Sequence, residues 1–227
     1  MTKEVSRLSN RIFLILSGIF IASLVVSNLI FQKFFSWNPF GWFNFELSVG
    51  IIPYPITFLV TDIISEIYGK KKATDVVIAG LFASLFILII IWIADAAPSI
   101  ENSPLDDKTF SRVFNFTALA VAASMIAYLG AQFVDVRIYH FWKKLTNGKK
   151  MWLRNNASTF CSQITDTSVV LLLLCYFEVL DWTSFWTLFT SGILFKILVA
   201  VIDTPLLYLA THLIRKKLNL KFGQEVQ

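Results

Sequence analysis

Long apolar blocks constrain the fold of this chain more than any other sequence feature. Six of them, each roughly 19 to 30 residues long, match the length that a helix needs to cross a hydrocarbon core of about 30 Å. They cover residues 12–32, 47–68, 76–94, 113–136, 155–177 and 184–214. Only 15% of the residues are charged, against about 25% in a typical soluble domain. The sequence therefore predicts an all-α polytopic membrane protein, with residues 1–227 forming one bundle of six transmembrane helices.

The basic residues are distributed unevenly between the predicted loops. Sixteen of the 20 Lys and Arg fall in the N-terminal tail, the loops after the second and fourth blocks, and the segment after Leu213. Because basic residues concentrate in cytoplasmic loops, we expect both termini and these two loops to be cytoplasmic. The basic residues lie at span ends and not along an amphipathic face, so no nucleic-acid partner is predicted.

The second block opens with an unusual pair of prolines, Pro53 and Pro55. Proline removes a backbone donor and disfavours helix just before itself. Two interpretations follow. The span begins broken or bent near the outer surface, as in many transporters, or a regular helix begins at Pro55 after an outer loop.

Two similar tripeptides occur in the two halves of the predicted bundle. Residues 60–62 read Val-Thr-Asp in the second block, and residues 164–166 read Ile-Thr-Asp in the fifth. With three spans in each half, the two halves would have opposite orientations in the membrane. The repeated tripeptide therefore favours a 3+3 inverted repeat.

Six ionisable side chains lie inside the apolar blocks. They are Asp62, Glu66, Asp135, Asp166, Asp203 and Lys196. A charge at the centre of a bilayer costs at least a few kcal/mol, so such residues normally face a bundle interior or a wet cavity and mark a pathway or binding site. Five acids against one base cannot all be charged and unpaired, so some must be protonated or neutralised by a cation. The pattern predicts a transporter whose cavity suits a cationic or donor-rich ligand, protons or sodium.

Helical spacing groups these residues with nearby amides, because residues three or four apart share a face. Asp62 lies one turn from Glu66, and an amide lies one turn before both Asp135 and Asp166. Asn28 adds a neutral amide nearer the outer side. The predicted ligand-binding set is Asn28, Asp62, Glu66, Gln132, Asp135, Gln163, Asp166 and Lys196.

Ordinary structural roles compete with binding at several of the ionisable positions. Glu66 is close enough in sequence to pair with Lys70 or Lys71, and Asp135 lies near Arg137. Asp203 precedes Thr204-Pro205, where a helix bend would use its carboxylate, so structure and function both remain open there. Asp166 and Lys196 are deeper in their blocks. We expect Lys196 to pair with one of the membrane aspartates, because an unpaired ammonium in hydrocarbon is costly.

Motifs for catalysis, metal binding and nucleotide binding are missing from the sequence. His140 and His212 lie at the predicted cytoplasmic ends, and no His-Glu-x-x-His or Gly-x-Ser-x-Gly pattern occurs. Cys161 and Cys175 are too far apart on one helix to form a disulfide. No Gly-x-x-x-x-Gly-Lys-Ser/Thr loop is present. We therefore expect no enzyme activity, no cofactor and no metal, with an intramembrane enzyme as the less favoured alternative.

An ordered set of short motifs runs along the chain. The motifs are Ser27-Asn28-Leu29-Ile30, residues 55–62, Gly69 after Ile67-Tyr68, residues 131–136, residues 152–159, Asp166-Thr167 and Phe195-Lys196. Together they resemble the queuosine precursor transporters of the vitamin uptake transporter type. The resemblance covers all six predicted spans. It implies a multi-pass protein of the bacterial inner membrane that imports 7-cyano- and 7-aminomethyl-7-deazaguanine, precursors of the tRNA nucleoside queuosine.

The implied substrate suggests roles for the candidate residues. A guanine-like edge presents adjacent N–H donors that one carboxylate accepts in bidentate fashion, and an aminomethyl group adds a cation. Asp62 and Asp166, with Gln132, Asp135 and Gln163, are candidates for acceptors, while Asn28 or Lys196 would donate to the ring carbonyl. The energy source stays open between proton or sodium coupling and service as the substrate-binding subunit of an ATP-driven complex. A homodimer and a partner subunit are both compatible with the sequence.

Overall fold

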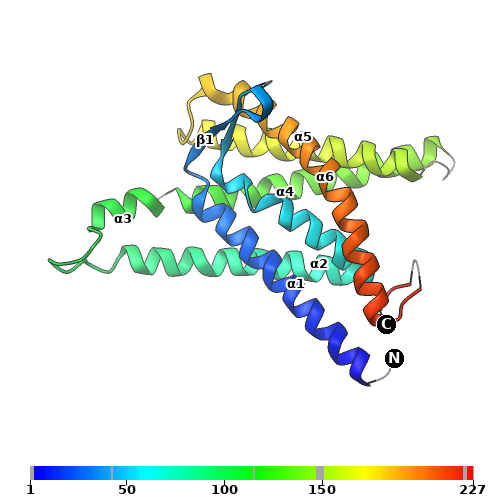
Figure 1. Cartoon of the computed structure of the whole chain (residues 1–227). Helices are drawn as coiled ribbons and strands as arrows, with labels where there is room; N and C mark the ends of the chain where they lie inside the picture. The colour runs from blue at the N-terminus through cyan, green and yellow to red at the C-terminus, as the bar shows by residue number, and fades with distance from the viewer. Residues whose placement is uncertain (1–2, 42, 115, 147–150, 222–223, 227) are drawn as a thin grey trace. The chain divides into compact units, whose positions relative to one another are not determined.

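The computed structural model describes residues 3–41, 43–114, 116–146, 151–221 and 224–226, with some helical residues described by their backbone alone. Six helices form most of the chain (Figure 1). They are α1 (Lys3–Ile30), α2 (Tyr54–Asp95), α3 (Asp107–Phe114), α4 (Thr117–Leu145), α5 (Met151–Tyr176) and α6 (Phe185–Leu218). Two short strands, β1 (Phe34–Trp37) and β2 (Phe45–Ser48), pair between α1 and α2.

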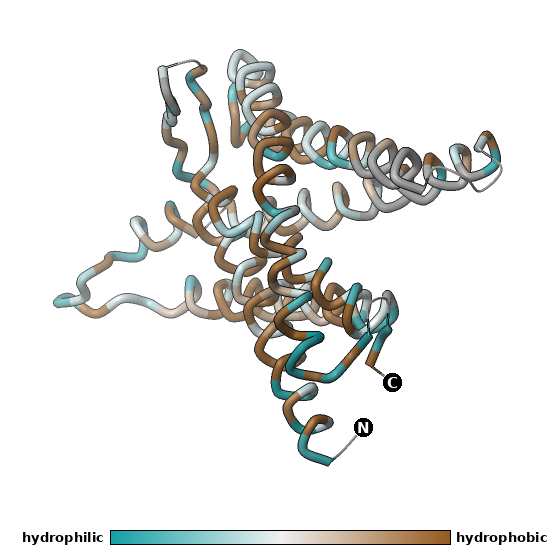
Figure 2. Tube along the Cα trace, turned by 45° about the vertical axis from the view of Figure 1, so that its right-hand side comes forward, coloured by the Kyte–Doolittle hydropathy of each residue, from teal (hydrophilic) through white to brown (hydrophobic). Residues whose placement is uncertain are grey.

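Five stretches of the described chain are long and apolar enough to cross a membrane. They are Lys3–Ile30, Val49–Gly69, Lys71–Asp95, Asp107–Tyr128 and Trp182–Leu218, and a shorter apolar helix covers Phe160–Tyr176. Figure 2 shows these apolar residues along the long helices and hydrophilic residues at both chain ends. The chain is thus a multi-pass, predominantly helical membrane protein. The count of six spans and the inverted repeat stay predictions.

The chain divides into two compact units. Unit 1 comprises Met1–Lys33, Ser48–Ser111 and Ile197–Gln227, and unit 2 comprises Phe34–Leu47 and Arg112–Lys196. The division between them falls inside α6, directly after Lys196. The prediction of a single domain over the whole chain stays a prediction, and each unit is described separately below.

The core of unit 1 lies between α1, α2 and the last turns of α6. Its buried side chains are Phe20, Val60, Ile63, Ile64, Ile67, Tyr68, Val76 and Leu218. Gly80 on α2 allows close packing, because a Cβ there would lie 2.9 Å from both Phe20 and Leu24 of α1. Small residues at helix interfaces in membranes allow backbones to approach in this way. Packing of α1 on α2 therefore depends on van der Waals fit at this glycine.

α2 contains two membrane-crossing segments separated by a break at Gly69. This residue has φ 86° and ψ 161°, a combination that is essentially restricted to glycine. The chain after α6 returns to this break. The Val226 N–H donates to the Ile67 carbonyl over 2.8 Å, and the Glu225 carboxylate lies 2.5 Å from the place where a Cβ on Gly69 would be. The C-terminal segment thus satisfies a carbonyl at the helix end that would otherwise lack an intrahelical partner.

Three basic segments of unit 1 meet at the end that contains this break. The Tyr68 hydroxyl donates to the Ser9 carbonyl over 2.9 Å, which brings the N-terminal part of α1 to the Gly69 turn. The Lys72 ammonium lies 5.4 Å from the centre of the Phe13 ring. The return of the C-terminal segment adds the basic end of α6. The N-terminal tail, the second loop and the C-terminal end therefore lie at the same end of unit 1, while their cytoplasmic location stays a prediction.

The double-proline segment folds as a short turn followed by a regular helix. A 3₁₀ turn covers Val49–Ile51, and α2 begins at Tyr54 with Pro55 in its first turn. The Ser48 hydroxyl accepts a hydrogen bond from the Gly50 N–H at 3.1 Å and donates to the Phe31 carbonyl. The Ser27 hydroxyl donates to the Gly50 carbonyl. The interpretation of a regular helix beginning near Pro55 is therefore confirmed. Hydrogen bonds join the turn before this helix to α1 and to the residue that follows α1.

Unit 2 is built on α4 and α5, which pack side by side as a helical hairpin (Figure 1). The two strands join this unit. The Glu46 N–H donates to the Ser191 hydroxyl of α6 over 3.1 Å, and the Trp37 ring contacts the rings of Phe45 and Phe195, with centroids 5.4 and 6.1 Å away. The sequence did not predict this β-hairpin, because its aromatic residues also suit a loop at the membrane surface.

We expect Gly69→Ala to destabilise the protein, because alanine strongly disfavours the backbone conformation at the break and its Cβ would collide with Glu225. The expected loss of unfolding free energy is about 1–3 kcal/mol, measured as a lower thermal unfolding temperature in detergent. Gly18→Ala is the matched control, since Gly18 lies inside α1 and a Cβ added there would meet no neighbouring atom within 4 Å. Equal unfolding temperatures for both variants would contradict this account of Gly69.

Candidate substrate site

One face of α5 carries three polar side chains inside its apolar part. Gln163, Asp166 and Thr167 share this face because they lie three and four residues apart. The Thr167 hydroxyl donates to the backbone carbonyl of Gln163 over 2.9 Å, as hydroxyls inside helices commonly do. This bond holds the Thr167 oxygen at a fixed place on the face, where it can also accept a hydrogen bond. These three residues are called the α5 group below.

Lys196 of α6 donates a hydrogen bond to the Thr167 hydroxyl and forms an ion pair with Asp166. Its Nζ donates to Asp166 Oδ2 over 2.8 Å and to Thr167 Oγ1 over 2.9 Å. The Lys196 and Asp166 side chains are only 12% and 20% exposed. The prediction that Lys196 pairs with a membrane aspartate is therefore confirmed. Removing one member of a buried pair costs about 3–5 kcal/mol, so each group depends on the other.

α6 contacts α5 next to this pair. Gly192 lies one turn before Lys196, on the same helix face. A Cβ at Gly192 would be 3.4 Å from Cγ2 of Thr167, an ordinary van der Waals distance. This part of α6 therefore packs directly against the part of α5 that carries Thr167 and Asp166.

The side-chain carbonyl of Gln163 is a buried acceptor beside this pair. Its Oε1 is shielded from solvent and receives no hydrogen bond from the described residues. A buried acceptor left unsatisfied costs about 1–3 kcal/mol, and such groups in native structures call for an explanation such as a function or a bound molecule. The combination of a carboxylate, an ammonium, a hydroxyl and an open acceptor is suited to a flat ligand with several donors and acceptors.

Thr167 was not among the predicted binding residues. Its position gives the available signal, because it follows Asp166 directly and lies four residues after Gln163. Two predicted residues on α4, Gln132 and Asp135, lie outside the described side chains. Their backbone belongs to α4, which packs against α5 in the same unit.

The other predicted residues belong to unit 1. Asn28 is half-buried on α1, and Asp62 is exposed on α2. Asp203 of α6 is close enough to Asp62 for their charges to repel. No basic side chain in the described part of the chain forms an ion pair with either acid. These carboxylates form an acidic position within unit 1, whereas the α5 group belongs to unit 2.

Glu66 forms an ion pair at the basic end of unit 1. Its Oε1 accepts from Arg215 Nη2 over 2.5 Å, and its backbone carbonyl accepts from the same nitrogen over 3.4 Å. Arg215 is distant in sequence, and the expected neighbour Lys71 does not form the pair. The Glu66 side chain is 48% exposed. The Arg215 side chain is only 9% exposed, so this pair joins α2 to α6 with its carboxylate towards solvent.

Three curated relatives match the chain. A protein of Bacillus subtilis named "Probable queuosine precursor transporter" is 25% identical over 76% of this chain and 75% of its own length. The "Queuosine precursor transporter" of Escherichia coli is 26% identical over 64% of this chain and 60% of its length. A Haemophilus influenzae protein named as probable for the same role is 25% identical over 56% of this chain and 51% of its length. No solved structure matches the chain.

A family model described as "Putative vitamin uptake transporter" matches residues 48–210. This match includes all of α2, α3, α4 and α5, and most of α6. It therefore contains both the α5 group and Lys196. The chain belongs to the vitamin uptake transporter family, and is a transporter and not an enzyme.

Proposed function

We propose that this protein imports queuosine precursors across the bacterial inner membrane and binds the 7-deazaguanine ring at the α5 group. The observation that carries the proposal is the mostly buried Asp166–Lys196 pair, with the unsatisfied Gln163 acceptor one turn before Asp166 on the same helix face. The names of the three relatives supply the substrate class. The chemistry of the α5 group suits that class.

The proposed contacts follow from donors and acceptors. The ring N–H and exocyclic amine of a guanine-like edge are adjacent donors, and the two oxygens of Asp166 would accept them in bidentate fashion. Lys196 would donate to the ring carbonyl while staying close to Asp166. Gln163 Oε1 would accept a further N–H, which removes the cost of leaving it unsatisfied. Substrate binding would therefore complete a hydrogen-bonding network that is incomplete among the described residues.

The remaining predicted residues take different roles in this proposal. Gln132 and Asp135 are proposed for the 7-substituent, where an aminomethyl cation needs a carboxylate. Asn28 stays a candidate donor. Glu66 is assigned to the ion pair that joins α2 to α6, because Arg215 already donates to its carboxylate.

Asp62 and Asp203 favour ion coupling over an ATP-driven complex. Two nearby carboxylates in apolar segments repel each other, and their mutual repulsion is relieved when a proton or a cation binds between them. We therefore propose that this pair takes up the coupling ion, a proton or sodium. An importer built this way needs no phosphate-binding loop, and the sequence contains none.

The function is tested by complementation in bacteria that cannot synthesise queuosine precursors. The wild-type protein should restore queuosine in tRNA when either precursor is supplied at low concentration. Asp166→Asn should lower uptake of labelled precursor about tenfold or more, because it removes charge-assisted hydrogen bonds to substrate. Asp181→Asn is the matched control, since it removes the same charge from an exposed loop residue.

A double variant separates binding from folding. Asp166→Asn leaves the Lys196 charge without its buried partner, so that variant is also expected to lose stability. Asp166→Asn with Lys196→Met removes both charges and should recover thermal stability and membrane expression. If the double variant also recovers uptake, the pair is structural and the proposed site is wrong.

Gln163→Leu is expected to separate substrate affinity from stability. It removes the unsatisfied acceptor, so the unfolding temperature should stay the same or rise, whereas precursor affinity should fall about threefold to tenfold through the lost hydrogen bond. Binding is measured by isothermal titration on purified protein. Thr165→Val is the control on the same helix, because its hydroxyl bonds the Cys161 carbonyl one turn earlier. Unchanged affinity in the Gln163 variant would exclude this residue from the site.

Asp203→Asn is expected to uncouple transport from the ion gradient. Removing one acid of the pair removes its repulsion and its need for a coupling ion. In proteoliposomes, gradient-driven accumulation should fall while precursor exchange across the membrane continues. Asp75→Asn, at an exposed position on α2, is the control. Full accumulation in the Asp203 variant would overturn the assignment of the coupling site.

A further inference from the structure

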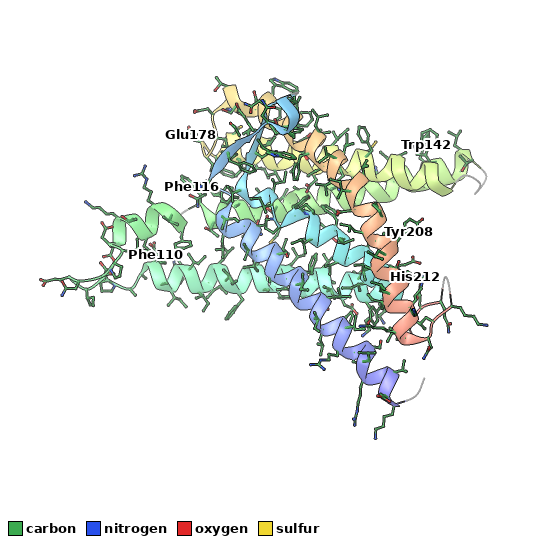
Figure 3. All side chains as sticks on the ribbon, viewed as in Figure 1. Phe110, Phe116, Trp142, Glu178, Tyr208 and His212 are labelled. Carbon is green, nitrogen blue, oxygen red and sulfur yellow. The ribbon has the colours of Figure 1, made fainter. Side chains whose placement is uncertain are left out.

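A groove that the transport proposal does not use lies along the C-terminal turns of α6. It encloses about 540 Å³ and lies entirely within unit 1. Figure 3 shows two of its lining residues, Tyr208 and His212, one turn apart on α6 on the side where the chain returns after that helix. Leu220 of the returning chain contributes to its lining.

The lining of the groove changes from apolar to basic along the helix. Tyr208 and Leu209 supply apolar surface at one end, and His212, Arg215 and Lys216 supply nitrogen donors at the other, where Leu220 also lies because its N–H bonds the Arg215 carbonyl. No acidic residue of the described chain lines it. His212 and Lys216 lie four residues apart and share a face. The groove therefore combines a basic end for an anion with an apolar part for hydrocarbon.

The position of the groove brings it to the place where lipid headgroups lie. Arg215 at its basic end pairs with Glu66, directly before the Gly69 break that separates the two crossing segments of α2. The N-terminal tail and the second loop add further basic residues to this end of unit 1. Basic clusters at the ends of membrane helices attract anionic phospholipids, and pockets among them bind lipid headgroups.

We propose that this groove binds one acidic phospholipid. The lipid phosphate would accept hydrogen bonds from Lys216 and His212, with the nearby Arg215 adding positive charge, and an acyl chain would lie along Tyr208 and Leu209. The complementary charge distinguishes this occupant from a neutral lipid, and the apolar half distinguishes it from free phosphate. Because Arg215 also forms an ion pair with Glu66, the bound lipid would lie next to the ion pair that joins α2 to α6.

Native mass spectrometry of the purified full-length protein tests the proposal. Phosphatidylglycerol and phosphatidylcholine with the same acyl chains are added separately, and the fraction of protein that retains one lipid is measured. Phosphatidylglycerol should be retained in preference to phosphatidylcholine. Lys216→Gln should lower its affinity about fivefold, the effect expected for one basic residue near an anionic headgroup.

Lys217→Gln is the matched control. Lys217 is an exposed neighbour of Lys216 with the same charge, and it does not line the groove. Its removal should change affinity less than about twofold, because an exposed charge outside the groove is screened. Equal losses in the two variants, or equal retention of the two lipids, would overturn the proposal. Displacement of phosphatidylglycerol by the same concentration of inorganic phosphate would also overturn it, in favour of a free-phosphate site.

Discussion

The contact between Lys196 and Asp166 is the interaction on which the arrangement of α5 and α6 in unit 2 depends. Both groups lie in helices that are otherwise apolar and both are mostly buried. Removing either group from water is expensive, and the cost is offset only when charge, geometry and remaining hydrogen bonds are all satisfied. Lys196 meets this condition through a carboxylate and a hydroxyl together. Gly192 lies next to Thr167 where the two helices meet.

The two ion pairs of the described chain have different physical weights. Glu66 is half exposed while Arg215 is only 9% exposed, so solvent screens the carboxylate side of this pair. The Asp166–Lys196 pair is shielded, so its loss would leave a charge without compensation. The first pair joins helix ends close to the basic segments. The second lies beside an acceptor that the described residues leave open, and this difference is why the proposed binding site is placed on α5 and not at Glu66.

Sequence reasoning predicted interactions that a strong local rule imposes. A lysine deep in an apolar block requires an acidic partner, so its pairing with a membrane aspartate was predictable. A helix tolerates proline in its first turn, so the beginning of α2 near Pro55 was also accessible from sequence. Three of the four basic segments that the positive-inside rule groups together meet at one end of unit 1. Other features depend on long-range packing that no local rule specifies. Arg215 pairs with Glu66 across most of the chain, whereas Lys71 offered a much closer sequence neighbour. Thr167 lies beside Lys196 because α6 packs against this part of α5, where Gly192 is close to Thr167.

The proposed site would discriminate between ligands through free energy, because a ligand that does not fully replace the hydrogen bond from Lys196 to Asp166 binds less tightly. A ligand that inserts at Asp166 must supply donors as good as the Lys196 ammonium, or it leaves a buried charge with weaker partners. Sites that hydrogen-bond a ligand reject analogues lacking the matching group far more strongly than apolar pockets reject a missing methylene. A purine-like ring without the exocyclic amine would therefore lose more than one hydrogen bond, since the Asp166 oxygen it fails to satisfy stays buried. The same ion pair that stabilises the membrane helices would in this way set the selectivity of the transporter.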